Sequence, residues 1–270
     1  MKSLLMFGLI LCLMSEVCLA GNNMNYSNVE DIPPEKWLEL NKKKIYFGHQ
    51  SVGFNIIDGI ELVMKEHPVI QLNIIEGRKF DGPEGAFVHS RVGKNRDPES
   101  KIIDFTNVID KELGQTPDAA ALKFCYVDAY DKINVNNIFL KYKDATEKLK
   151  KDNTGLTIIH FTMPLHTQKI TWKTKVKLLA GRDAWEFHDN IKRNEFNKLL
   201  LAEYKGKEPV FDIARFEATT PDGSTIGFQY KGEEYFAVNP EYSEDGGHLN
   251  VIGRKRIAEN FLLFLINELL

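Results

Sequence analysis

The chain contains little cysteine, three residues among 270, and this scarcity limits its chemistry. Cys12 and Cys18 lie within the first twenty residues, so a chain trimmed after Ala20 keeps Cys125 alone and has no internal disulfide. Cys125 lies in the apolar run ALKFCYV. This setting predicts a buried, small hydrophobic residue rather than a reactive thiol.

A membrane-spanning run is lacking at the N-terminus, where the apolar stretch Leu4 to Met14 is too short to cross a bilayer comfortably. This stretch follows a basic start at Lys2 and precedes small residues that end at Ala20. The pattern predicts a signal peptide over 1–20, a secreted or periplasmic protein, and no membrane insertion after cleavage. A lipoprotein acylated at Cys18 is the less favoured alternative, because the Glu-Val pair before it suits lipidation poorly.

An excess of one charge sign is lacking as well. The chain has 35 Lys and Arg against 38 Asp and Glu, a net charge of −3. This balance gives no reason to expect nucleic acid as a partner. Internal repeats and low-complexity segments are absent from the sequence. Residues 21–36 are polar and turn-rich and predict an N-terminal arm, and residues 37–270 are long enough for one α/β domain.

Short apolar runs alternate with stretches of helical spacing along this domain. The runs lie at 44–48, 69–75, 120–127, 156–163 and 209–213, and the helical spacing lies near 53–64, 138–149, 191–200 and 251–270. Continuous apolar strands between helices predict a parallel sheet covered on both faces. We therefore expect an α/β fold, a three-layer α/β/α sandwich with a mostly parallel five-stranded sheet.

Ser51 lies in the segment YFGHQSVG, just after the first predicted strand and just before the first helix. Ligands of open parallel sheets bind at the carboxyl ends of the strands, so this position suits a nucleophile. Serine is also a favoured N-cap, and from this segment alone a helix cap is the simpler interpretation.

Asp245 and His248 lie in the segment SEDGGHLN, a glycine-bearing loop before the last predicted helix. A carboxylate three residues before a histidine can orient the imidazole, which is the orienter–base half of a nucleophilic triad. The alternative is a turn at the start of the helix.

Together the two segments resemble the SGNH (GDSL-like) hydrolase family, over nearly all of the chain after residue 20. FGHQS stands where the family has Gly-Asp-Ser, with one residue inserted, and DGGHLN matches its Asp-x-x-His block. The resemblance implies an SGNH or flavodoxin-like fold and a catalytic triad of Ser51, His248 and Asp245. It implies neither a metal site nor an organic cofactor.

The family's oxyanion hole implies donors from three blocks. The amides of Ser51 and of Gly93, in HSRVGKN (89–95), match two of them. Asp128 stands near the place of the family's asparagine, and an ionised carboxylate accepts hydrogen bonds without donating them. Three explanations are open: a protonated Asp128, Asn95 as the substitute donor, or a degraded hole. We favour Asn95, because it shares a short loop with Gly93.

Three further side chains are candidates for the pocket: His49, Asp128 and His89. His160 and His166 flank FTMPL and raise the question of a metal pair with Asp245. We expect no metal, because His160 should point away from the strand end and no further ligand cluster is evident.

The segment 165–188 is long for a connection in a compact sheet protein and carries Trp172, Trp185 and several basic residues. The tryptophans either stack on a sugar ring or anchor a surface element to the core, and we favour the anchor. A hairpin expected over 219–238 can wall the acyl pocket. The function expected from the resemblance is an exported serine esterase acting on a carbohydrate or other small ester. An acyltransferase with the same triad and a non-catalytic glycan- or envelope-binding protein are the alternatives.

Overall fold

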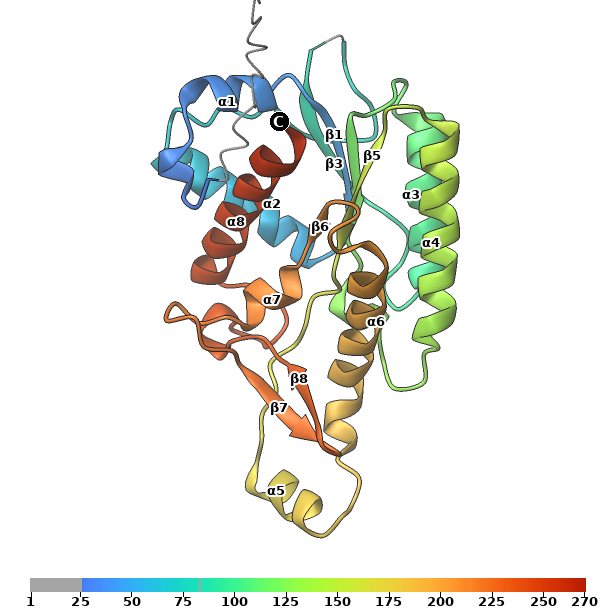
Figure 1. The fold of residues 1–270 in the computed structure, drawn as a ribbon, viewed down its shortest axis with the longest axis vertical. Helices are drawn as coiled ribbons and strands as arrows, with labels where there is room; N and C mark the ends of the chain where they lie inside the picture. The colour runs from blue at the N-terminus through green and yellow to red at the C-terminus, as the bar shows by residue number, and fades with distance from the viewer. Residues whose placement is uncertain (1–25, 83) are drawn as a thin grey trace, which may run out of the picture.

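A computed structural model of the chain describes residues 26–82 and 84–270. Its centre is one sheet of six parallel strands in the order β2-β3-β1-β4-β5-β6 (Figure 1). The strands are β1 Lys44–His49, β2 Ile74–Glu76, β3 Ala86–Arg91, β4 Ala119–Leu122, β5 Thr157–Phe161 and β6 Val210–Phe211. The α/β class and the parallel sheet agree with the prediction, and the sheet has one strand more than expected.

Helices cover both faces of the sheet and make a three-layer sandwich (Figure 1). One face packs against α1 Pro34–Leu40, α2 Val52–Glu66, α7 Ile213–Ala218 and α8 Val251–Leu269. The other face packs against α3 Pro98–Asn107, α4 Val135–Asp152 and α6 His188–Tyr204. Shorter helical turns lie at Val29–Asp31, Val108–Glu112, Tyr126–Asp128, Trp185–Phe187 and Pro240–Tyr242.

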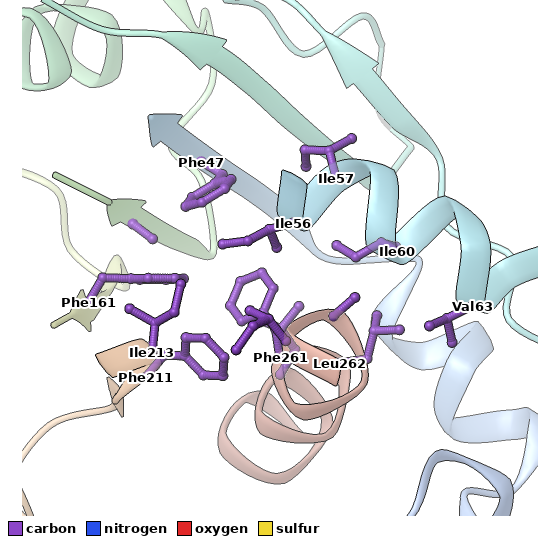
Figure 2. Packing of buried hydrophobic residues seen from close by; sticks show 14 of the residues in the cluster. Phe47, Ile56, Ile57, Ile60, Val63, Phe161, Phe211, Ile213, Phe261 and Leu262 are labelled. Atoms are coloured by element: carbon purple, nitrogen blue, oxygen red, sulfur yellow. The ribbon is translucent and has the colours of Figure 1, made fainter. Parts of the chain in front are cut away.

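The alternation of side chains along β1 explains the two layers. Phe47 points toward α2 and α8, where it packs with Ile56 and Phe261 (Figure 2). Tyr46, one residue earlier, lies in the core on the opposite face, because successive strand residues point to opposite sides. Full burial of such a side chain stabilises the fold by about 1.5–3 kcal/mol. The core thereby fixes the end of β1, where Ser51 begins the next turn.

The strand β3 is the additional strand that the sequence did not predict. The apolar run 69–75 is mostly irregular and enters only the short edge strand β2, whereas β3 lies where we expected a loop. β3 is buried between β2 and β1 although it carries His89 and Ser90. Both polar side chains have partners, because Ser90 bonds the Tyr46 hydroxyl and His89 bonds His49. A buried strand whose polar side chains are hydrogen-bonded does not appear in the sequence as a continuous apolar run, so β3 was not predicted.

The N-terminal region bears on the predicted domain boundary. The expected signal peptide, 1–20, lies outside the described residues, as does the start of the arm. Tyr26 is tied to α8 through two hydrogen bonds with Asn267, and Trp37 on α1 is buried in the core. The helix α1 therefore crosses the boundary expected at residue 37. Within 26–82 and 84–270, no helix has both the length and the apolar character needed to cross a membrane.

A small subassembly extends from one end of the molecule (Figure 1). It combines α5 Trp172–Leu179 with the expected hairpin, whose strands are β7 Gly227–Tyr230 and β8 Glu233–Phe236. The hairpin packs with residues that follow α5 in a core of its own, made by Ala184, Phe187, Ile191, Phe228, Tyr230, Tyr235 and Ala237, and Leu178 of α5 lies partly buried against it. This core connects the segment that carries α5 to the hairpin, so α5 lies at the tip of the molecule, beyond β7 and β8 (Figure 1).

Candidate active site

Ser51 lies directly past β1 at the first turn of α2 in a strained backbone conformation, with φ +49° and ψ −107°. Its side chain makes no capping hydrogen bond to the helix. Instead, the Ser51 hydroxyl lies 2.5 Å from Nε2 of His248. The helix-cap interpretation of Ser51 is therefore wrong.

His248 completes a continuous chain of hydrogen bonds. Its Nδ1 lies 2.5 Å from Oδ2 of Asp245, while the other carboxylate oxygen accepts from the backbone amides of Gly247 and His248 at 2.9 and 2.7 Å. Partial burial raises the pKa of Asp245, but these hydrogen bonds outweigh it and hold the pKa well below the ordinary value. Asp245 is thus an anion that fixes the imidazole with Nδ1–H toward itself and Nε2 toward Ser51.

One hydrogen bond ties the Asp-x-x-His loop to α2, and two more brace the loop internally. Asn55 on α2 accepts a hydrogen bond from the Leu249 amide at 3.0 Å. The Ser243 hydroxyl donates to the His248 carbonyl at 2.6 Å and accepts from the Gly246 amide at 2.9 Å. The loop and the helix that begins at Ser51 therefore form one unit, which keeps the imidazole in register with the hydroxyl.

A buried lysine holds the peptide that joins Gln50 to Ser51 through a hydrogen bond to the Gln50 carbonyl. Lys123, just past β4, is fully buried and donates to the Gln50 carbonyl at 2.9 Å. Burial lowers the pKa of Lys123 to about 8. In a planar trans peptide the C=O and the following N–H point in opposite directions, so this bond aims the Ser51 amide away from Lys123. No described group accepts from that amide, which leaves it available to an oxyanion.

Gly93 corrects the predicted oxyanion hole. Its amide donates to Oδ2 of Asp104 at 2.8 Å, and Asp104 is itself paired with Arg78. The Gly93 amide is therefore already used inside the fold. The glycine serves the turn instead: its φ is +53°, and a Cβ there would lie 2.5 Å from the Lys101 backbone nitrogen.

Within residues 26–82 and 84–270, the Nδ2 donor of Asn95 has no hydrogen-bond acceptor. Its Oδ1 accepts from the Lys101 ammonium at 2.9 Å. Because an ammonium only donates, this contact fixes which end of the amide is oxygen and turns Nδ2 away from Lys101. The Gln50 side chain donates to the carbonyls of Val92 and Gly93 at 3.1 and 3.0 Å, so the Asn95 loop is tied to the segment that carries Ser51.

Asp128 is a buried anchor and not an oxyanion donor. Its Oδ2 lies 2.5 Å from the Lys101 ammonium and 2.7 Å from the Cys125 amide, and its Oδ1 accepts from the Arg96 amide at 2.9 Å. Both oxygens therefore accept from nitrogen donors, and no acceptor calls for a carboxylic proton. The protonated-acid explanation is wrong, because Asp128 with Lys101 forms a buried ion pair that supports the Asn95 loop.

Removing the charge of Asp128 should destabilise the protein. In Asp128→Asn the Lys101 ammonium stays buried without its counter-ion, and we expect a loss of roughly 3–5 kcal/mol in the free energy of unfolding. Urea unfolding of the variant measures this loss. The double variant Asp128→Asn/Lys101→Met should recover a large part of it, because no buried charge is left. Wild-type stability of the single variant would contradict the ion-pair assignment.

The predicted pocket residues His49 and His89 are also buried, so they do not face a ligand. Their rings bond each other, from Nε2 of His49 to Nδ1 of His89 at 3.0 Å, and burial holds the pKa of His49 well below its usual value. A Cβ on Gly53 would lie 2.2 Å from the His49 ring. The two histidines therefore pack beneath the start of α2.

His160 and His166 are not brought together. His160 is buried and bonds the Tyr142 hydroxyl and Glu208, on the side of α4 and α6. His166 lies near the site, with its ring 5.6 Å from that of Tyr126. In the part of the chain that the structure describes, no three His, Cys, Asp or Glu side chains are grouped to hold a metal ion.

A cavity of about 640 Å³ adjoins the triad at Asp245. Its volume falls within the range of small-molecule sites. Arg193 of α6 lines the cavity. Its side chain is almost fully buried and donates to the Tyr126 carbonyl at 2.6 Å and to Oδ1 of Asn190 at 2.7 Å. The other walls are polar and include His166, Gln168, Glu186, Asp189, Asn190 and the Ser243–Gly246 turn.

Glu217 is a further buried ionisable group, and it should make stability depend on pH. Burial raises the pKa of Glu217 to about 8, and the charge of Asp212 adds to this rise. The Leu165 amide, Lys123 and Arg193 act in the opposite direction and lower the pKa. The folded state keeps a proton that the unfolded state loses above pH 4.5. The resulting stability is complete below pH 4.5 and disappears as the pH rises through about 8.

Glu217→Gln should flatten this fall, since an amide cannot ionise. Urea unfolding across the same pH window measures the effect, with Glu234→Gln as the control for an exposed carboxylate. An unchanged pH profile in Glu217→Gln would contradict the assignment.

The sequence did not reveal three polar residues that support the site. They are Lys101, Lys123 and Gln50, and in the sequence alone they resemble ordinary surface residues. One signal was present: Lys123 interrupts the apolar run AALKFCYV, and a charge inside a buried strand indicates a specific partner.

Comparisons with known proteins give matches among solved structures only. No family model and no curated protein matches the chain. A proposed platelet activating factor from Streptococcus pneumoniae is 15% identical, covers 86% of this chain and 90% of its own, and has a TM-score of 0.48. A proposed lipolytic protein of the G-D-S-L family from Desulfitobacterium hafniense is 12% identical, covers 83% of this chain and 99% of its own, and has a TM-score of 0.46.

The acetyl xylan esterase AlAXEase is 13% identical over 81% of this chain and 98% of its own, with a TM-score of 0.44. The second of these three proteins carries the name of the family that the sequence resembles. At such identities and scores these are likenesses in general fold, and the chemistry of this chain follows from its own side chains.

Proposed function

We propose that the chain is an exported serine ester hydrolase of the SGNH type. One observation carries the proposal: the Ser51 hydroxyl, the His248 imidazole and the Asp245 carboxylate form an unbroken hydrogen-bonded chain at the carboxyl end of a parallel sheet. The strained backbone of Ser51 supports it, because such strain gathers at functional positions.

The geometry gives each residue a step. Nε2 of His248 takes the hydroxyl proton while Ser51 Oγ attacks the ester carbonyl, and Asp245 stabilises the imidazolium. The negative charge that forms on the carbonyl oxygen is met by the Ser51 amide and by Nδ2 of Asn95. The intermediate collapses to the acyl-enzyme, and His248 returns the proton to the departing alcohol. Water activated by His248 then releases the acid and restores Ser51.

The substrate that we propose is an acyl group on a carbohydrate or another small ester. The adjoining cavity supports a polar alcohol portion, because amide and carboxylate side chains such as Gln168, Asn190 and Glu186 line it. Hydroxyl groups can both donate to the carboxylates and accept from the amides and from Arg193. An acyltransferase would use the same triad with an acceptor hydroxyl in place of water.

Labelling with a fluorophosphonate probe tests the proposal. The probe should modify one serine, and mass mapping of a digest should place the adduct on the peptide that contains Ser51. Ser51→Ala should take no label, and the control Ser224→Ala, in the exposed turn that precedes β7, should label like the wild type. Wild-type protein that takes no label, or label on another serine, would reject the triad.

A further inference from the structure

We propose that residues 169–185 form a peripheral docking surface for anionic lipid headgroups; we call it the α5 surface. It lies at the tip of the molecule, beyond the hairpin β7–β8 (Figure 1). The surface combines apolar side chains that face solvent with basic residues around them. This combination is typical of segments that lie in a membrane–water interface.

The apolar part of the α5 surface is unusually open. Leu179 is 88% exposed, Trp172 and Trp185 are each 70% exposed, and Val176 and Ile170 are 53% and 44% exposed. Trp172, Val176 and Leu179 are spaced four and three apart and share one face of α5. The expectation that the two tryptophans anchor this segment to the core is therefore wrong, and this apolar area has no covering partner within the described chain.

The charge of the α5 surface is mostly positive. Between residues 169 and 185 five cations stand against one carboxylate, Asp183, on a chain whose net charge is −3; the cations are Lys169, Lys173, Lys175, Lys177 and Arg182. The Lys173 ammonium lies 5.9 Å from the Trp172 ring, and the Lys177 ammonium lies 5.5 Å from the Trp185 ring. Basic residues near a bilayer attract anionic lipid, and interfacial tryptophan suits the headgroup level.

The inner side of the α5 surface is firmly held, so its outer face is presented as a fixed shape. Thr171 caps α5, and Thr174 donates to Glu186 at 2.9 Å. Lys177 pairs with the same carboxylate at 2.9 Å, and Phe187 is buried against the hairpin. The exposed apolar side chains are thus a property of a folded element.

Lipid explains this surface better than glycan or nucleic acid. A sugar ring stacks on aromatic side chains, but it gains little from exposed leucine, valine and isoleucine, which lose contact with water only in an apolar medium. The surface also borders the cavity, because Lys169 at its start and Glu186, the residue directly after it, line the cavity wall. If the proposed esterase function holds, docking places the triad beside esters that are held at a lipid surface.

Vesicle cosedimentation tests the docking directly. The probes are vesicles of phosphatidylcholine alone and vesicles in which part of it is replaced by phosphatidylglycerol. We expect binding to the anionic vesicles at low salt, weakened by high salt because the headgroup attraction is screened. All variants share the same N-terminus, so any contribution of residues 1–25 cancels in the comparison.

Two variants separate the two parts of the surface. Lys173→Gln/Lys175→Gln should weaken binding about 25-fold, from roughly a fivefold loss for each of the two charges. Its control, Lys148→Gln/Lys151→Gln on α4, removes the same charge elsewhere. Trp172→Ser/Leu179→Ser should weaken binding at least about tenfold, since burial of a large apolar side chain is worth that much. Its control is Leu140→Ser, at a site 56% exposed on α4.

The result that would overturn the proposal is simple. Wild-type protein that does not sediment with anionic vesicles rejects it, as does binding that is equally strong in the α5 variants and their controls. Retention on an acidic polysaccharide in place of vesicles would assign the surface to a glycan instead. Labelling of Ser51 is measured in solution, so failure of docking and failure of the esterase proposal give different results.

Discussion

Ser51→Ala is expected to lower the turnover of a short aryl ester by at least about 10⁴-fold, because loss of a triad nucleophile removes the covalent route. The remaining hydrolysis would come from the oxyanion donors and from binding alone. Initial rates at saturating ester measure the effect. His248→Ala should cost a similar factor, and the double variant should cost little more than either single variant, since the two residues act as one unit.

The same substitution should leave stability nearly unchanged. The Ser51 hydroxyl is bonded to His248 alone and caps no helix, so its removal deletes little packing. The thermal midpoint of Ser51→Ala serves as the control against misfolding. Full esterase activity in a well-folded Ser51→Ala variant would end the nucleophile assignment, whatever the probe labels.

Asn95→Ala should reduce the catalytic constant by roughly 10²–10³, the usual cost of one side-chain donor in an oxyanion hole. The Michaelis constant should change little, because this donor meets charge that develops only in the transition state. The structure sharpens this expectation. With the Gly93 amide bonded to Asp104, the Ser51 amide and Nδ2 of Asn95 are the donors that remain in our assignment.

Asn95→Asp is the matched variant, since it keeps the size of the side chain and its acceptor for Lys101 but removes the donor. It should lose at least as much turnover as Asn95→Ala. Wild-type turnover in both variants would show that the side chain lies outside the hole, and the Ser51 amide would then be the chief donor.

The architecture could be predicted because its signals are local. Apolar runs and helical spacing give the alternation of strands and helices, and a parallel sheet brings the ends of its strands to one edge. That rule makes Ser51 a candidate, and the resemblance to the SGNH family pairs it with His248, 197 residues further along the chain. β3 escaped detection because its polar residues His89 and Ser90 find buried partners on β1.

The support of the site could not be predicted, because it depends on partners that spacing does not reveal. Gly93 looked like an oxyanion donor until Asp104, on the following helix, was seen to accept its amide. Asp128 looked like a defect until Lys101 was found against it. The same residue types on a solvated loop would have had neither role.

The positive φ of Ser51 has a consequence for how this chain can change over generations. A non-glycine residue at φ +49° costs free energy, and glycine would relieve that cost by about 1 kcal/mol. Selection for folding alone would therefore favour glycine at position 51, which the serine codons AGU and AGC reach by a single base change. A lineage that kept this fold for binding alone would drift in that direction, whereas an esterase of the proposed kind would keep the serine.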